Sequence, residues 1–217
     1  GDPLEAWRRA KDQHPPPGTL ASVAQAHVQE LDTFLRRQAI VTMPDAEPIV
    51  AAPSPDFYRW ALASMWTSGP FESKPSRAYY YLTDADPSWP AERQREHMRD
   101  FNLPTLWNVS IHEVLPGHFL QCQRLRQVES KVRKSTLFAP SSFVEGWAHY
   151  CEQMMVEAGF RRDDPTVRLG QLSEALVRLA RVVVAIRLHC EDLSVEQGMR
   201  FFRDEAFLEE TTARREA

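Results

Sequence analysis

Two histidines six positions apart mark the stretch of this chain with the clearest chemical signature. The segment reads His-Glu-Val-Leu-Pro-Gly-His, from His112 to His118. In the common zinc-peptidase motif His-Glu-x-x-His, the histidines lie four apart on one helical face and bind one zinc ion, while the Glu between them acts as general base. Six residues of an unbroken helix turn the chain by about 600°, so His112 and His118 would point in different directions and could not share an ion.

The residues between the two histidines can interrupt the helix and so bring the histidines closer together. Pro116 lacks a backbone N–H and cannot continue the helical hydrogen bonding, and Gly117 tolerates backbone angles that other residues resist. A kink or bulge there would rotate His118 back toward His112. Alternatively, Pro-Gly ends one helix and starts a turn, and the histidines are incidental. These residues alone leave both interpretations open.

A second segment carries three ionisable groups with helical spacing. Ser141 and Ser142 are good helix N-cap residues, and residues 143–157 have the apolar periodicity of a helix. Glu145, His149 and Glu152 fall at i, i+4 and i+7, so they share one face. Burying three such groups is costly unless something satisfies them, and a metal ion with supporting hydrogen bonds would do so. The alternative is a solvated polar face.

The two motifs together resemble a known family. His-Glu-x-x-Pro-Gly-His at 112–118 and Glu-Gly-Trp-Ala-x-Tyr-x-Glu at 145–152 are similar to the bacterial DUF885 family, a group assigned to the zincin-like metallopeptidases. The resemblance covers about residues 40 to 205. Further matching positions are Tyr80-Tyr81, Leu120-Gln121, residues 168–172, Arg178, Arg181, Val183-Val184 and His189.

The resemblance implies a mainly α, zincin-like helical metallopeptidase fold with a short β element near the active site. It makes His112, His118 and Glu145 the ligands of one Zn²⁺ ion, with water in the fourth position, as in catalytic zinc sites. Glu113 would take a proton from that water as it attacks a carbonyl. Glu152 would orient a ligand imidazole through its other ring nitrogen.

Hydrolysis also needs donors for the charge that develops on the carbonyl oxygen. His189 matches the family's histidine at the end of a long helix and is the first candidate. Tyr150 and the Tyr79–Tyr81 group are weaker ones. A histidine near a helix C-terminus also interacts favourably with the last carbonyls and the helix dipole, which is the structural alternative for His189.

Tyr80 and Tyr81 are predicted to contact the substrate. The segment from Tyr79 to Leu82 reads as a short strand, and in zincin-like peptidases an extended edge strand near the zinc often holds the substrate backbone by strand addition. We therefore expect this segment to be such an edge strand. An aromatic strand is more often simply part of a core.

The chain departs from the family pattern at several positions. Ala185 stands where the family has an acidic residue and Arg187 where it has a glycine, and loss of an acidic partner for His189 would alter or reduce activity. His149 replaces an apolar residue one turn from Glu145. It is a candidate extra ligand, substrate contact or hydrogen-bond donor behind the ligands, and we expect the last.

Length is the larger departure, because family members are commonly more than twice as long as these 217 residues. The chain begins Gly-Asp-Pro, as expected of an excised piece, a processed piece or a naturally short relative. Residues 1–217 are predicted to form a single mostly helical domain, the catalytic core of a longer architecture. Homo-oligomerisation, or association with the missing family segments, would complete its groove.

The sequence predicts helices that alternate with few extended segments. Residues 40–55 contain four prolines and are predicted to be extended, and residues 79–82 to form a strand. Helices are predicted at about 3–13, 22–38, 56–64, 91–100, from 104 through the first motif, 143–157, 165–189 and 194–208.

Composition fits a globular domain and excludes some partners. Hydrophobic residues make up 43% of the chain, enough for a substantial core, and the net charge is −4 with Lys and Arg scattered among acids. This disfavours a nucleic-acid partner, and no apolar run is long enough for a membrane span. The three cysteines show no Cys-x-x-Cys spacing, which predicts buried thiols rather than disulfides. We expect a soluble bacterial protein, cytoplasmic or exported by a signal outside this chain.

Three functions remain open. The first is a zinc metallopeptidase that acts on a peptide or small amide. The second is a truncated, non-catalytic zincin-like binding module, suggested by Ala185, Arg187 and the missing flanks. The third is a zinc hydrolase of a small non-peptide amide or ester, which uses the same activated water.

Overall fold

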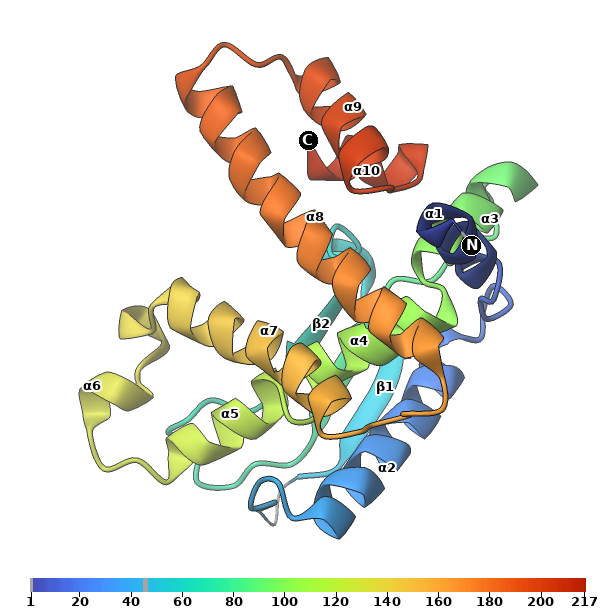
Figure 1. The fold of residues 1–217 in the computed structure, drawn as a ribbon. Helices are drawn as coiled ribbons and strands as arrows, with labels where there is room; N and C mark the ends of the chain where they lie inside the picture. Colours follow the sequence, from blue (N-terminus) through green and yellow to red (C-terminus); the bar gives the residue numbers. More distant parts are fainter. Residues whose placement is uncertain (1, 45–46) are drawn as a thin grey trace. The chain divides into compact units, whose positions relative to one another are not determined.

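The chain is mainly helical and divides into two compact units (Figure 1). The computed structural model describes residues 2–44 and 47–217. We call residues 18–84 and 109–162 the sheet unit, and residues 1–17, 85–108 and 163–217 the helical unit. The predicted single domain over residues 1–217 stays a prediction, so each unit is described by itself.

The sheet unit contains one small sheet and the helices around it. Its elements are α2 (Leu20–Gln38), β1 (Ile49–Pro53), η1 (Asp56–Tyr58), β2 (Ala63–Trp66), β3 (Ala78–Leu82), the end of α4 (Leu103–Glu113), α5 (His118–Arg126), α6 (Lys131–Lys134), η2 (Thr136–Phe138) and α7 (Ser141–Glu157). The strand order is β1-β3-β2, with β1 parallel and β2 antiparallel to β3. The predicted strand at 79–82 is confirmed.

The position of β3 in the sheet corrects one prediction. β3 is the central strand, because Tyr80 pairs with Ala51 of β1 on one side and with Met65 of β2 on the other. Its backbone groups are therefore used on both sides, and it cannot accept a substrate strand. The outer edge of β1 is covered by the side-chain amide of Gln25 on α2, which bonds the backbone of Ile49 and Ala51. In the described part of the chain, no strand pairs with the outer edge of β2.

Two predicted helices are wrong in extent. The helix expected at 56–64 is only a 3₁₀ turn, Asp56–Tyr58, and Ala63–Trp66 is a strand. Pairing with β3 and packing of the Trp66 ring against Tyr58 and Tyr81 override the local helical pattern. The last predicted helix, 194–208, ends at Glu205 and is followed by a separate one, Glu210–Glu216.

The junction between α4 and α5 is a bulge of four residues, Val114 to Gly117. The amide of Gly117 donates to the carbonyl of Ile111 at 3.0 Å, and that of Leu120 to Val114 at 3.4 Å, so these hydrogen bonds span six residues instead of four. A side chain cannot be placed at Gly117, because an added Cβ would lie 1.7 Å from the carbonyl oxygen of His112. The predicted kink is present, and glycine is what allows the bulge to fold against the end of α4.

The helical unit contains α1 (Pro3–Lys11), α3 (Ala91–Asp100), the start of α4, α8 (Pro165–Cys190), α9 (Val195–Glu205) and α10 (Glu210–Glu216). Its apolar core joins α8 to the two last helices through Val177, Ala180, Val184, Phe202, Ala206 and Ala213. The helices predicted at 91–100 and 165–189 are confirmed.

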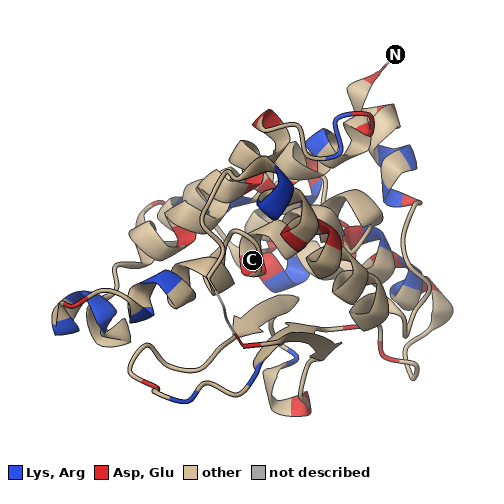
Figure 2. Cartoon of the chain, turned by 90° about the horizontal axis from the view of Figure 1, so that it is seen from below, with Lys and Arg blue, Asp and Glu red and all other residues tan. Residues whose placement is uncertain are grey.

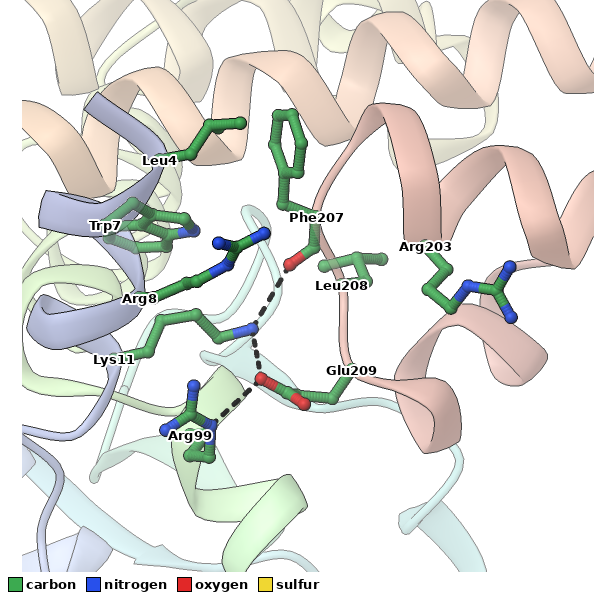
Figure 3. Close-up of a pocket in the computed structure, with 9 residues that line it drawn as sticks. All are labelled: Leu4, Trp7, Arg8, Lys11, Arg99, Arg203, Phe207, Leu208 and Glu209. Carbon is green, nitrogen blue, oxygen red and sulfur yellow. Dashed lines mark hydrogen bonds and ion pairs between the residues drawn. The ribbon is translucent and has the colours of Figure 1, made fainter. Parts of the chain in front are cut away.

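A buried lysine ties the first and last segments of the helical unit together (Figure 3). The ammonium group of Lys11 contacts the carboxylates of Asp100 at 2.9 Å and Glu209 at 2.8 Å and the carbonyl of Phe207 at 3.2 Å. Burial opposes the ionisation of Glu209, but its contacts with Lys11 and Arg99 outweigh this effect and lower the pKa of Glu209. The three N–H donors of Lys11 are thus matched by three acceptors. Lys11 also lines the adjoining pocket of about 250 Å³, where its role is structural.

Charged residues are interspersed on the helices, whereas the three strands carry none (Figure 2). None of the helices in the described part of the chain combines the length and apolar character of a membrane span. All three cysteines are free, as predicted. The prediction that they are buried holds for Cys151 and is wrong for Cys190, which is exposed near the end of α8.

A buried ion pair joins the end of α5 to the segments that flank the sheet. Arg126 donates to both carboxylate oxygens of Glu47, at 2.7 and 2.9 Å, and to the carbonyl of Ser68 at 2.8 Å, while the hydroxyl of Thr67 donates to Glu47 at 2.7 Å. The Glu47 side chain has no exposed surface. Burial opposes its ionisation, but the hydrogen bonds from Arg126 and Thr67 lower its pKa to about 2.

We expect Glu47 to make the fold acid-sensitive. Its carboxylate stabilises the folded state fully above its unfolded pKa of 4.5, and this contribution is lost as pH falls from there toward 2. A shift of this size corresponds to about 3 kcal/mol at pH 7. Urea unfolding from pH 7 to 2.5 should therefore show a steep loss in the wild type and a shallower one in Glu47→Gln. Parallel curves for the two proteins would contradict this assignment.

The bulge generates a second prediction. Gly117→Ala should destabilise the protein by about 2 to 4 kcal/mol, because the new methyl group must displace the backbone of α4 or the bulge itself. Gly146→Ala is the matched control, since an added Cβ in the middle of α7 meets no atom within 4 Å. The control should gain about 0.5 to 1 kcal/mol from higher helix propensity. Equal unfolding free energies for the two variants would show that the bulge tolerates a side chain.

Candidate metal centre

His112, His118 and Glu145 come together in the sheet unit. The Nε2 atom of His112 lies 3.3 Å from one carboxylate oxygen of Glu145, and Nε2 of His118 lies 3.5 Å from the other. The two imidazole rings are nearly perpendicular, with centroids 4.7 Å apart. One potential ligand atom from each of the three residues lies within 4.8 Å of the other two. The predicted convergence of these side chains is therefore present.

Three elements deliver the side chains. His112 lies in the last turn of α4, His118 is the first residue of α5, and Glu145 lies near the start of α7. The bulge at 114–117 replaces the helical turn that would have separated the histidines, and α5 contacts α7 within the same unit. The six-residue spacing is thus compatible with a shared centre because the helix is interrupted.

Glu152 supports the centre from behind. Its carboxylate is completely buried, and one oxygen lies 2.6 Å from Nδ1 of His112. This contact fits the tautomer of His112 that carries its proton on Nδ1, in which the lone pair of Nε2 is directed toward Glu145. This orientation is the one that a metal-binding imidazole needs. The other oxygen of Glu152 lies 3.3 Å from Nδ1 of His149, which places His149 behind the ligands.

The spacing of the donor atoms suits a zinc-sized ion. Two ligand atoms that are each about 2.0 to 2.1 Å from a tetrahedral zinc ion lie roughly 3.3 Å from one another. The distances of 3.3 and 3.5 Å between the imidazole nitrogens and Glu145 match this value, although a protonated imidazole would attract the same carboxylate. Two neutral imidazoles and one carboxylate form a donor set that divalent zinc accepts. The residues present therefore fit the ion.

One side of the centre is open. The Glu145 side chain is 63% exposed, whereas the side chains of His112 and His118 are largely buried. Glu113 is half-buried and follows His112 directly at the end of α4. The side of the centre at Glu145 is therefore in contact with the solvent.

The other predicted site residues lie in different surroundings. Tyr80 is completely buried, its hydroxyl lies 3.2 Å from that of Ser110, and burial raises its pKa. Tyr81 is only half-buried, and its predicted contact with the substrate stays a prediction. Tyr150 is exposed and packs near Trp147. Five residues after Glu145, it points well away from the face of that ligand.

His189 belongs to the helical unit. Its Nδ1 atom donates to the carbonyl of Ala185 one turn earlier on α8, at 2.7 Å. This is the contact expected of a histidine near a helix C-terminus. Its predicted catalytic role stays a prediction.

Sequence reasoning gave no role to two further residues of α7. The indole N–H of Trp147 and the thiol of Cys151 both point at the bulge between the histidines. Burial raises the pKa of Cys151 to about 12, so its sulfur keeps its proton at neutral pH. The family motif contains Trp147, but a motif letter does not disclose which backbone atom a side chain contacts.

Comparison with known proteins extends these observations. No match was found among curated proteins. A structure of a putative lipoprotein of unknown function from Shewanella oneidensis matches 98% of this chain with a TM-score of 0.81 and 27% identity. A putative lipoprotein from Colwellia psychrerythraea matches 97% with a TM-score of 0.76 and 22% identity, a likeness of fold. The chain spans 38% and 35% of the lengths of these two proteins.

The match to a family covers nearly the whole sequence. The family described as "Bacterial protein of unknown function (DUF885)" matches residues 4–217, which include both histidines, the bulge and all of α7. The chain therefore belongs to the DUF885 family.

Proposed function

We propose that this protein is a zinc-dependent, zincin-like hydrolase that cleaves peptide or amide bonds. The observation that carries the proposal is the convergence of His112, His118 and Glu145 at ligand-to-ligand distances suited to zinc. The buried hydrogen bond from His112 to Glu152 supports it, because orientation of an imidazole by a carboxylate is typical of metal centres.

The chain's own residues divide the chemistry between them. When bound, a divalent ion supplies Lewis acidity, which lowers the pKa of water and polarises a carbonyl. Glu113, beside the ligands, accepts a proton from the attacking water and returns it to the leaving amine. Glu152 holds the ring of His112 throughout, and the exposed side of Glu145 admits the substrate.

The outer edge of β2 is the best candidate for holding a peptide backbone. β2 lies at the edge of the sheet, and α5, which begins with His118, contacts β2. A peptide added to this edge would continue the sheet past Trp66, whose ring packs on Tyr81. This assigns to β2 the role that the sequence suggested for β3. The names of the two relatives, putative lipoproteins, favour an exported enzyme.

Metal content tests the centre directly. The wild type, purified without chelators, should contain about one zinc ion per chain by elemental analysis, because three protein ligands suffice for a catalytic zinc site. His118→Ala should lose most of it. His14→Ala, in the other unit, is the control and should retain it. A wild type without metal, even after incubation with zinc, would rule out the proposed centre.

Glu113 tests the chemistry separately from the metal. Glu113→Gln should keep the zinc but lower the turnover of peptides from a mixed library by roughly 10² to 10⁴, the usual contribution of a general base. Mass spectrometry of the products would identify the bond that is cut. Full turnover by the variant would remove Glu113 from the mechanism, and zinc binding without turnover of any peptide by the wild type would favour a non-catalytic role.

A further inference from the structure

The carbonyl oxygen of Pro116, in the bulge between the histidines, is buried and takes its hydrogen bonds from side chains. Among the described residues, its donors are the indole N–H of Trp147 at 3.0 Å and the thiol of Cys151 at 3.6 Å. The same indole N–H also reaches the carbonyl of Gly117 at 3.3 Å. Buried carbonyls are nearly always paired. Side chains of α7 supply the hydrogen-bond donors for the Pro116 carbonyl that the backbone of the bulge does not supply.

The two donors lie on one flank of α7 and the site carboxylates on the other. Trp147 and Cys151 are four residues apart, and Glu145 and Glu152 are seven apart, so each pair shares a side of the helix. The buried residues between the two flanks include Ala148 and Met155. Helix α7 is therefore held on both sides, by the ring of His112 on one and by the carbonyl of Pro116 on the other.

This arrangement controls where His118 lies. His118 follows Pro116 and Gly117 directly, so any shift of these two peptide groups moves its ring relative to Glu145. Glu145, in turn, is two residues from Trp147 on the same helix. The hydrogen bond from Trp147 to Pro116 therefore connects the backbone next to His118 with the helix that carries Glu145.

We propose that Trp147 and Cys151 are positioning residues of the metal centre, which clamp the Pro116 carbonyl and so set the distance between His118 and Glu145. The inference rests on the proposed function, because it concerns the geometry of that centre. Neither side chain is a ligand or a proton carrier. Their effect reaches the ion only through the backbone of the bulge.

The experiment separates the donor from the bulk of the side chain. Trp147→Phe keeps an aromatic ring but removes the N–H, and Cys151→Ala removes the weaker S–H donor. Trp60→Phe, at an exposed tryptophan of the same unit, is a matched control outside the bulge. Zinc affinity is measured by competition with a chromophoric chelator. The visible absorption spectrum of the Co²⁺-loaded protein reports coordination geometry, and thermal unfolding of the metal-free proteins reports stability.

We expect Trp147→Phe to weaken zinc binding by about 10- to 100-fold, the usual effect of losing a partner that orients ligands, and to change the cobalt spectrum. Cys151→Ala should show a smaller loss in the same direction, because a thiol is a weak donor. Trp60→Phe should bind zinc as the wild type does.

Other results would overturn the inference in distinguishable ways. Wild-type zinc affinity and an unchanged cobalt spectrum in Trp147→Phe, with only a lower unfolding temperature, would mean that Trp147 is structural, while the proposed function stands. A wild type that binds no metal would remove the proposed function and the clamp together. If Trp147→Phe does not fold, Cys151→Ala decides, and an unchanged affinity and spectrum in that variant would overturn the clamp.

Discussion

The hydrogen bond between Nδ1 of His112 and the buried carboxylate of Glu152 is the interaction on which the candidate centre depends. A carboxylate without exposed surface costs several kcal/mol unless it is paired, so this contact favours the position of α7 along α4 at which Glu152 meets the ring of His112. Glu145 lies two turns earlier on the same helix, and its place beside the histidines follows from that register. One buried contact thus determines both the orientation of an imidazole and the approach of a carboxylate.

The second requirement is an irregular backbone beside a regular helix. Between α4 and α5 the backbone hydrogen bonds join residues six apart, and Gly117 packs directly on the carbonyl of His112. The chain can therefore change direction within the four residues of the bulge. Helix α7, by contrast, runs without interruption over 17 residues and presents its side chains at regular intervals. The centre is therefore assembled from one local distortion, which brings the histidines together, and one regular helix, which carries the groups that meet them.

Local patterns predicted the parts of the structure that local physics controls. The apolar stripe of α2, the extent of α8 and the break at Pro116-Gly117 follow from spacing and backbone chemistry within a few residues. The predicted serine N-cap of α7 is wrong, because the helix already includes Ser141 and its N-cap residue is Pro140. The convergence of Glu145 with the histidines came from the family resemblance, because periodicity cannot place one helix against another. What depends on distant pairing was missed: Ala63–Trp66 becomes a strand only through β3, and the partnership of Glu47 with Arg126 joins positions 79 residues apart. The contacts of Trp147 and Cys151 with the Pro116 carbonyl cannot be predicted from the spacing of side chains, because the acceptor is a backbone atom.

The exposure of Glu145 has a kinetic consequence for the proposed centre. The two imidazoles belong to buried or nearly buried side chains, whereas most of the Glu145 side chain is exposed. Exposed side chains change rotamer within nanoseconds, while release of a buried ring requires local unfolding. Rotation of the Glu145 side chain alone would therefore open one side of the proposed centre to the solvent, without unfolding of the protein.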